Sequence, residues 1–327
     1  MNITSQRLVF HRTGPPEDVL ELEEIPCPDA GSDVLLHVVA SPINPSDINF
    51  IQGVYGIRPD LPSTAGFEGV ARVEESLQAS GLTQGTLVIP IKSAHMWQNY
   101  VTAPANSLIP LPKDINTSQA AMLSVNPLTA LRLLRDFTTL KPGDWIVQNA
   151  ANSSVGRCVI QLARYFGWRT LNLVRRDDCV ADLLNSGADH VLVEHATVSD
   201  EMKALLGKDG ARLALNAVGG ESALALAKVL ATGGHHVTFG AMSKRPLTIP
   251  NGLMIFKQPH FHGFWLTRWL ETAPRQTLMD DYGLLAGLMV QNELIMPVEK
   301  EYSLSAFKEA LPHAEQGSRD GKILFRC

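Results

Sequence analysis

Residues 145–156 form a segment that could bind a phosphate. An apolar run, Trp-Ile-Val-Gln, leads through the small residues Asn-Ala-Ala-Asn-Ser-Ser to Val155 and Gly156, where a helix is expected to start. Backbone amides at a helix N-terminus bind pyrophosphate, and small side chains let it come close. The G-x-G-x-x-G fingerprint is absent, because Ser153 and Ser154 stand where glycines are often found. A strand-to-helix connection without a ligand is the alternative.

Arg175 and Arg176 stand at the end of the next expected strand. In dinucleotide-binding folds an acid at this place binds the ribose 2′-hydroxyl of NADH, whereas an arginine accommodates the 2′-phosphate of NADPH. A guanidinium stays charged and matches phosphate in a bidentate manner. We therefore favour NADPH, although the adjacent Asp177 and Asp178 act against this choice. A solvated pair of surface arginines is the alternative.

Other residues with possible chemistry do not form a convincing site. His260 and His262 would share one face of a strand, but no Cys or carboxylate lies close in sequence, so we predict no metal site. His235 and His236 would point to opposite faces. Cys158 lies within an expected helix and is interpreted as packing. The nucleophile motif of serine hydrolases and the P-loop motif are both missing.

The elements that would position these residues follow from the hydrophobic pattern. One expected helix has Val155, Val159, Leu162 and Phe166 on one face and ends at Gly167. Strands alternate with such helices, which indicates an α/β fold with a doubly wound parallel sheet. The expected strands are residues 145–149, 170–174, 190–193, 213–216, 236–239 and 260–264, and a second helix covers residues 222–231 and ends at the glycines 233–234.

The two ends of the chain have a different pattern from its middle. Short apolar runs at residues 34–39, 69–73 and 87–91 are separated by Pro, Gly and Asn, which is typical of strands and turns. After a helix around residues 276–289, strand-like pieces end at residues 322–325. We therefore expect the tail to complete the first domain.

Composition and charge exclude several classes of protein. The 327 residues include 28 Lys and Arg against 33 Asp and Glu, a net charge of −5, so no nucleic-acid partner is expected. The longest uncharged stretch carries three prolines, so no membrane span is expected. The four cysteines are scattered and form no C-x-x-C pair. The first residues resemble neither a signal peptide nor an organelle leader, which predicts a cytoplasmic protein.

Several motifs together resemble those of the medium-chain dehydrogenase/reductase superfamily, and in particular its zinc-free, mitochondrial-type 2-enoyl thioester reductases. The similarity covers nearly the whole chain. It implies a Rossmann dinucleotide-binding domain at residues 121–259 and a mainly β, GroES-like catalytic domain at residues 1–120 and 260–327. The motifs that carry it are residues 44–56 (NPSDINFIQGVYG), 66–69, 125–130, 148–156, 213–220, 239–242, 263–266 (GFWL) and 321–324.

The resemblance also shows where zinc ligands are missing. Zinc alcohol dehydrogenases of the superfamily carry a Cys and a His at the positions of Ser46 and Phe67, and the four-cysteine zinc lobe is absent here. A phenyl ring cannot bind zinc. Hydride addition to a 2-enoyl thioester needs no metal but does need a proton source. By resemblance Tyr55 is that donor, since a phenol with a pKa of about 10 is protonated at neutral pH; on spacing alone it could simply stabilise a turn.

Further residues are assigned by resemblance alone. Asn126 would contact the nicotinamide, the turn of residues 153–156 the pyrophosphate, and the arginine pair the 2′-phosphate. Trp97 and Trp265 are expected to line the substrate pocket. The full set of cofactor-binding candidates is Asn126, Ser153, Ser154, Val155, Gly156, Arg175, Arg176, Phe239, Gly240, Ala241, Met242, Phe264, Trp265, Leu266 and Lys322.

Three functions follow as hypotheses. The first is an NADPH-dependent reductase of 2-enoyl thioesters carried on coenzyme A or acyl-carrier protein. The second is a zinc-free NADPH:quinone oxidoreductase of the same fold, which needs no specific proton donor. The third is a non-catalytic NADPH-binding protein. The resemblance also implies a homodimer formed through the edge of the nucleotide-binding sheet.

Overall fold

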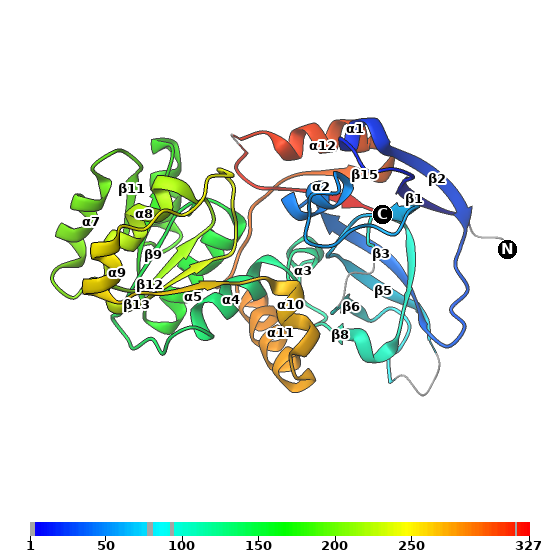
Figure 1. Ribbon diagram of the computed structural model, residues 1–327. Helices are drawn as coiled ribbons and strands as arrows, with labels where there is room; N and C mark the ends of the chain where they lie inside the picture. Colours follow the sequence, from blue (N-terminus) through cyan, green and yellow to red (C-terminus); the bar gives the residue numbers. More distant parts are fainter. Residues whose placement is uncertain (1–3, 77–80, 92–94, 318) are drawn as a thin grey trace. The chain divides into compact units, whose positions relative to one another are not determined.

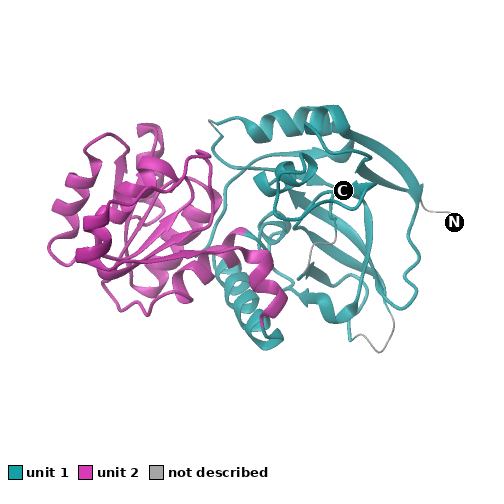
Figure 2. Ribbon diagram, viewed as in Figure 1, with its two compact units in different colours: residues 1–125, 274–327 teal, residues 126–273 magenta. Residues whose placement is uncertain are grey.

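The computed structural model describes residues 4–76, 81–91, 95–317 and 319–327. The chain divides into two compact units (Figure 2): one joins Met1–Val125 to Pro274–Cys327, and the other is Asn126–Ala273. These boundaries differ from the expected ones at 120/121 and 259/260. Residues 117–121 form helix α3, which packs on strands β3 and β5 of the first unit, and residues 260–263 pair as strand β14 in the sheet of the second.

The second unit, residues 126–273, contains a parallel sheet of six strands (Figure 1). Their order is β11-β10-β9-β12-β13-β14. With β9 as the first strand, this is the 3-2-1-4-5-6 order of a doubly wound dinucleotide-binding sheet, which confirms the predicted fold class. The strands are β9 (Trp145–Gln148), β10 (Arg169–Val174), β11 (His190–Val193), β12 (Ala211–Asn216), β13 (Leu230–Thr238) and β14 (His260–Gly263).

Helices cover both faces of this sheet, because successive side chains of a strand point to opposite sides. Leu171 and Leu173 of β10 belong to one apolar cluster, with residues of α7 and α8. Val174 belongs to another cluster, with residues of α5 and α6. The helices of the unit are α4 (Asn126–Arg135), α5 (Ser154–Phe166), η3 (Asp177–Cys179), α6 (Val180–Asn185), α7 (Val198–Leu206), α8 (Gly220–Lys228), α9 (Asn251–Lys257) and α10 (Leu266–Thr272).

Glycines end one predicted helix and not the other. Helix α5 ends at Gly167, which has φ +75°, as its pattern predicts. The expected helix over residues 222–231 was wrong at its end, since α8 stops at Lys228 and Gly233 and Gly234 lie inside strand β13. A Cβ on Gly234 would lie 3.1 Å from the carbonyl oxygen of Ala211. Gly234 therefore allows two strand backbones to approach where their register shifts, while Gly233 has φ +68°, a conformation that favours glycine.

The first unit is mainly β. A sheet has the order β15-β16-β3-β5-β6-β8, with β7 also paired to β3, and a smaller sheet has the order β2-β1-β4. The C-terminal strand β16 pairs antiparallel with β3, so the tail completes this unit. The strands are β1 (Thr4–Phe10), β2 (Leu20–Pro26), β3 (Val34–Pro42), β4 (Ser63–Thr64), β5 (Val70–Glu75), β6 (Leu87–Pro90), β7 (Tyr100–Ala103), β8 (Leu108–Pro110), β15 (Val298–Ser303) and β16 (Lys322–Arg326).

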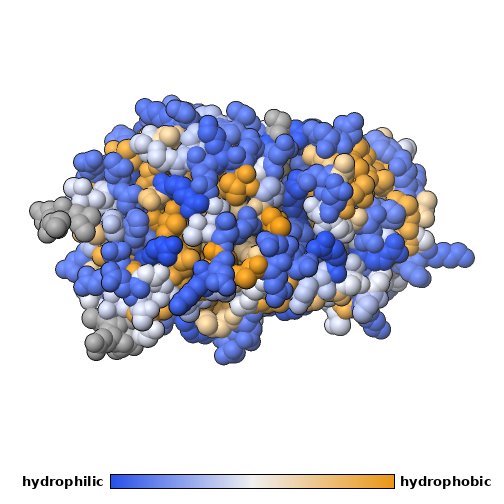
Figure 3. Space-filling view, turned by 180° about the vertical axis from the view of Figure 1, so that it is seen from behind, coloured by the Kyte–Doolittle hydropathy of each residue, from blue (hydrophilic) through white to orange (hydrophobic). Residues whose placement is uncertain are grey.

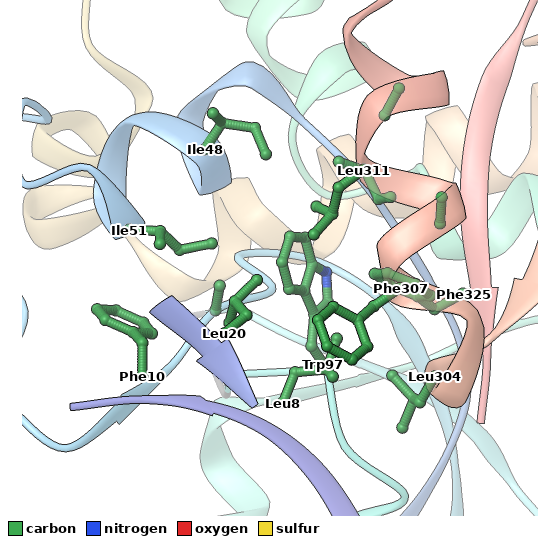
Figure 4. Packing of buried hydrophobic residues seen from close by; sticks show 14 of the residues in the cluster. Leu8, Phe10, Leu20, Ile48, Ile51, Trp97, Leu304, Phe307, Leu311 and Phe325 are labelled. Atoms are coloured by element: carbon green, nitrogen blue, oxygen red, sulfur yellow. The ribbon is translucent and has the colours of Figure 1, made fainter. Parts of the chain in front are cut away.

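Trp97 lies at the centre of a core of the first unit, among Leu8, Leu311 and Phe325 (Figure 4). Its ring is fully buried and meets Phe325 edge to face at 5.2 Å. The expected place of Trp97 in a substrate pocket is therefore corrected: it is a core residue. The helices of this unit are α1 (Pro16–Val19), α2 (Pro45–Ile51), η2 (Ala105–Ser107), α3 (Thr117–Ala121), α11 (Arg275–Val290), η4 (Leu304–Ala306) and α12 (Phe307–Glu315).

Hydrophilic residues dominate the face shown in Figure 3, with small hydrophobic groups between them. Within the described ranges, no helix has the length and apolar character needed to cross a membrane.

Candidate active site

The carboxyl edge of the six-stranded sheet gathers most of the candidate residues of the second unit. Because all six strands are parallel, the segments that follow them emerge at one edge. These segments contain the turn after β9, the arginines after β10, the loop after β13 and the aromatic residues after β14. Ligands of doubly wound sheets bind at this edge.

The turn after β9 is shaped for close approach of an anion. Ala150 has φ +48°, and the hydroxyl of Ser153 caps α5 by accepting the amide of Gly156 at 3.2 Å. A Cβ on Gly156 would lie 2.5 Å from the carbonyl oxygen of Ala151, so only glycine fits there. The first amides of a helix, here Ser154 and Val155, have no acceptor within the helix and are available to a phosphate. These residues therefore fit a pyrophosphate.

The two arginines after β10 have different surroundings. Arg176 folds back, with its Nε 3.1 Å from the carboxylate of Asp178 and a terminal nitrogen 3.7 Å from the sulfur of Cys179. Arg175 is exposed, and in the described part of the chain it makes no ion pair. Arg175 is thus the arginine whose guanidinium can turn to a 2′-phosphate, while Arg176 shapes the loop.

A buried polar network at the same edge was missed by the sequence analysis. The Asn149 amide donates to Asn216 and to Ser222, both at 2.9 Å, and Asn149 accepts the amide of Ala217 at 2.7 Å. Ser222 in turn donates to Glu194, which follows β11. The network ties together the ends of β9, β12 and β11. An asparagine at the end of each of two buried apolar strands is visible in the sequence, but the sequence does not show that the two asparagines meet.

The loop after β13 is fixed by main-chain contacts. The amides of Phe239 and Met242 donate to the carbonyls of Asn216 and Ala217, both at 3.0 Å. A Cβ on Gly240 would lie 2.9 Å from the Ala217 carbonyl, so the loop packs closely on the end of β12. Met242 is exposed, and Ala241 stands beside it in the same loop.

The segment after β14 borders a hollow of about 500 Å³. Phe264 meets Phe137 edge to face at 6.1 Å, and Trp265 is the residue that precedes α10, which starts at Leu266. The wall is aromatic and includes one cation, which suits a flat ring or an acyl group. The lining residues are Thr238, Gly263, Phe264, Trp265, Arg268, Trp269 and Thr272. Asn126, the first residue of α4, is buried and is not among these lining residues.

Tyr55 and Phe67 form an aromatic pair in the first unit. Tyr55 lies shortly after α2 and is half-buried, and its ring centroid is 5.4 Å from that of Phe67. Phe67 also meets Phe50 at 5.2 Å. The ring at the former zinc-ligand position therefore supports the phenol of Tyr55.

A buried network of charged groups holds the start of α2. Asp47 accepts the amides of Asn44 at 2.9 Å and Phe67 at 2.8 Å, and burial raises its pKa to about 6. Asn44 donates to Glu68 at 2.7 Å, and burial raises the pKa of that carboxyl as well. The ammonium of Lys322 donates to Asn44. Lys322 is buried, so here it secures the helix that precedes Tyr55.

No group of three His, Cys, Asp or Glu side chains that could hold a metal ion occurs in the part of the chain that the structure describes.

Two family models match the chain. The alcohol dehydrogenase GroES-like domain matches residues 30–113, and the zinc-binding dehydrogenase model matches residues 154–280. The two positions where zinc alcohol dehydrogenases carry Cys and His hold Ser46 and Phe67.

Curated relatives are similar over nearly the full length. The mitochondrial enoyl-[acyl-carrier-protein] reductase of Xenopus tropicalis is 38% identical over 325 residues, which cover 96% of this chain and 93% of the relative. The human enzyme of the same name is 42% identical over 313 residues, with 93% and 84% covered. The chain belongs to the mitochondrial-type enoyl reductase family. This family lies within the zinc-free medium-chain dehydrogenases/reductases, and the chain is an NADPH-dependent oxidoreductase of the class that acts on CH–CH groups.

Solved structures agree with this family assignment. The complex of Etr1p with NADP and crotonyl-CoA has a TM-score of 0.90 and 28% identity, with 99% of this chain and 100% of that chain covered. A candidate NADPH:quinone reductase from Bacillus thuringiensis also has a TM-score of 0.90, with 27% identity and 99% of each chain covered.

The prediction of a cytoplasmic location is contradicted. The enoyl reductase relatives from Xenopus tropicalis, human and Arabidopsis thaliana are all named as mitochondrial. The expectation rested on the composition of the first residues, which does not decide the compartment, and residues 1–3 lie outside the described residues.

Proposed function

We propose that this enoyl reductase reduces the C2=C3 double bond of trans-2-enoyl thioesters carried on coenzyme A or on an acyl-carrier protein. The observation that carries the proposal is the pair of Tyr55 and Phe67: the phenol of Tyr55 packs on the ring that stands at a zinc-ligand position of the zinc alcohol dehydrogenases. The names of the relatives and the crotonyl-CoA complex of Etr1p support the same substrate class.

The residues of the carboxyl edge would hold the cofactor. Ser153, Ser154, Val155 and Gly156 would bind the pyrophosphate, and Arg175 the 2′-phosphate. The loop of residues 239–242, residues 264–266 and Asn126 would contact the nicotinamide end. When bound, NADPH supplies a hydride, which we assign to the β-carbon of the substrate.

Tyr55 would then complete the addition. A hydride on the β-carbon leaves an enolate on the thioester, so the protein must supply a proton to the α-carbon and hydrogen bonds to the oxygen. The half-buried phenol of Tyr55 has a proton to give. Trp265 and the hollow beside it offer an apolar wall for the acyl group.

Replacing Tyr55 with Phe tests the proposal. We expect Tyr55→Phe to lower kcat/KM for crotonyl-CoA by about 100-fold or more, because the proton donor is lost. The Kd for NADPH, measured by fluorescence, should stay within about twofold of the original, because Tyr55 is not among the residues proposed to bind the cofactor. A twofold change is well below about 1.4 kcal/mol, which corresponds to tenfold. Tyr302→Phe is the matched control, because Tyr302 bonds His313 and has no assigned part in the reaction. Unchanged crotonyl-CoA reduction by Tyr55→Phe would refute the assignment.

Quinone reduction is the second candidate function. The similarity to the candidate quinone reductase from Bacillus thuringiensis and the aromatic wall of Phe264 and Trp265 favour it. Quinone reduction needs a flat pocket but no specific proton donor. Tyr55→Phe should therefore leave it intact, and a protein that reduces quinones faster than enoyl thioesters, with no effect of the substitution, would support this second function.

We also propose a homodimer formed through strand β14. This strand is the last in the sheet order, and no strand in the described ranges pairs with its outer edge. Helix α9, which packs on the adjacent β13, exposes three apolar side chains, Met254, Ile255 and Phe256. An unpaired edge beside an apolar helix is suited to a second copy of the same chain.

A further inference from the structure

The amino edge of the six-stranded sheet contains a second hollow, of about 590 Å³. Strands β9, β12 and β13 start there, and α7 ends there. Since β12 has six residues, about 20 Å of strand separates this edge from the phosphate-binding turn. The hollow is bordered by Gly143, Asp144, Trp145, Lys203, Leu206, Gly207, Lys208, Asp209, Gly210, Arg212, Val229, Leu230, Ala231, Thr232 and Lys257.

Cations outnumber anions around this hollow. Four cations border it, against the carboxylates of Asp144 and Asp209, although the whole chain has a net charge of −5. Asp144 accepts the amide of Lys141 at 2.8 Å, which fixes its position and leaves its charge. Lys203 is paired with Asp200 at 2.9 Å, whereas Lys208 and Arg212 make no ion pair among the described residues. The four cations are Lys203, Lys208, Arg212 and Lys257.

Lys257 fixes one of these charges in place. Its ammonium donates to the carbonyls of Lys228 at 3.0 Å and Leu230 at 2.7 Å, which leaves one of its three hydrogens for a ligand. Burial, and secondly the charge of Lys203, lower the pKa of Lys257. Capping the end of α8 explains the presence of Lys257, but it does not explain Lys208 and Arg212. An anion in the hollow would relieve the repulsion among all of them.

Trp145 gives the hollow a rigid border and a reporter. Its ring is almost fully buried, with the guanidinium of Arg169 3.8 Å from the ring centroid and His190 stacked at 5.6 Å. Trp145 is one of five tryptophans in the chain, so a change in fluorescence is assigned to it by comparison with Trp145→Phe.

We propose that this basic hollow binds a pyrophosphate-bearing anion at a site separate from that of the cofactor. The volume lies within the range of small-molecule sites and exceeds that of a single phosphate. Two linked phosphates offer more oxygens to the bordering cations than a single phosphate does, and each lysine or arginine adds charge-assisted hydrogen bonds. Free pyrophosphate and a nucleoside diphosphate share this chemistry.

Calorimetric titration of the NADPH-saturated protein tests the site, because the bound cofactor occupies the phosphate-binding turn. We expect inorganic pyrophosphate to bind with one equivalent per chain, to change tryptophan fluorescence in the original protein but not in Trp145→Phe, and to be released in about 1 M NaCl, where charges are screened beyond about 3 Å. ADP, titrated in the same way, tells the two sources apart. Equal or tighter binding of ADP would indicate a nucleotide, and weaker binding would indicate free pyrophosphate. Binding of ADP without binding of pyrophosphate would overturn the proposal.

A charge-reversal pair assigns the binding to the hollow. Lys208→Glu combined with Arg212→Glu should weaken pyrophosphate binding at least about tenfold, since two attractive charges become repulsive. Lys113→Glu with Lys308→Glu is the matched control, because it makes the same charge change at exposed positions of the first unit. No binding in the presence of NADPH, or equal loss in both double variants, would overturn the proposal.

Discussion

The phenol of Tyr55 is connected to the core of its unit by a series of aromatic contacts. Phe10 meets Phe50 at 5.8 Å, Phe50 meets Phe67 at 5.2 Å, and Phe67 meets Tyr55 at 5.4 Å. Phe67 is the ring that stands between the phenol and Phe50 in this series. Its role would be to position Tyr55, without contact to the substrate.

Phe67→Leu tests this positioning role. Loss of one ring contact costs up to about 1.4 kcal/mol, which corresponds to tenfold, so we expect kcat for crotonyl-CoA to fall by up to about tenfold while the Kd for NADPH stays unchanged. In a Tyr55→Phe background the same substitution should have no further effect on kcat, because there is no phenol left to position. A tenfold loss that persists in that background would show a merely structural effect.

The two arginines after β10 can be distinguished by their salt bridges. Arg175→Ala should raise the Kd for NADPH about tenfold or more and leave that for NADH unchanged, because a hydrogen bond to a charged group contributes about 1.5–3 kcal/mol. Arg176→Ala is the control, since Arg176 is already paired with Asp178, and its effect should be smaller. Equal losses for NADPH and NADH in Arg175→Ala would contradict the assignment of the 2′-phosphate contact.

The sequence predicts which residues could take part in a site better than it predicts how deeply those residues are buried and which partners they contact. The arginine pair follows a recognisable strand, so its position could be predicted, but the salt bridge that distinguishes the two members could not. The burial of Trp97 and the contact of Lys322 with Asn44 could not be predicted for one reason: their partners lie far away in sequence. Trp97 packs on Phe325, and Lys322 bonds Asn44. No local pattern contains such contacts.

At the scale of elements, the six strands were predictable because each is a short apolar run between helices. The irregularity of β13 could not be predicted, since two consecutive glycines such as Gly233 and Gly234 are typical of the end of a helix. In the structure they lie inside β13, close to where its register with β12 shifts. The polar network of Asn149, Asn216 and Glu194 was also not predictable, because it joins three strand ends through the tertiary fold.

Strand β13 also carries a pH-dependent contribution to stability. His236 is fully buried against α8, its Nε2 lies 3.3 Å from the carbonyl oxygen of Ala223, and burial lowers its pKa from 6.5 to about 4. The native protein thus keeps His236 neutral, while the unfolded chain takes up a proton below pH 6.5. The free energy of unfolding should therefore fall by about 3 kcal/mol as the pH falls from about 6.5 to about 4.

His236→Gln removes this titration and should flatten the pH dependence by that amount in urea unfolding. The buried carboxyls of Asp47 and Glu68 have the opposite sign, because their raised pKa values make the native state bind protons more readily; the difference between the two proteins cancels their contribution. His11→Gln, at an exposed position, is the control and should leave the profile unchanged. Parallel profiles for His236→Gln and the original protein would refute the prediction.

At the scale of the whole molecule, the two edges of the parallel sheet differ. One edge strand, β11, is flanked by α6, while the outer edge of β14 has no pairing strand among the described residues. Beside β14, α9 exposes Phe256 to 81% of its surface and Ile255 to 63%. Burial of such side chains against a second copy would recover about 25 cal/mol for each Å² of apolar surface. The sheet is therefore expected to continue across a twofold axis at β14.

Phe256→Asp tests this assembly. We expect the original protein to elute in light-scattering chromatography at twice the mass of one chain, and the variant at the mass of a single chain at micromolar concentration, because loss of an aromatic anchor plus a buried charge weakens a dimer by about 100-fold or more. Leu184→Asp is the matched control, since Leu184 is exposed on α6 near the other edge and should leave the dimer intact. If both variants stay dimeric, the interface lies elsewhere; if Leu184→Asp alone dissociates, it is the β11 edge that pairs.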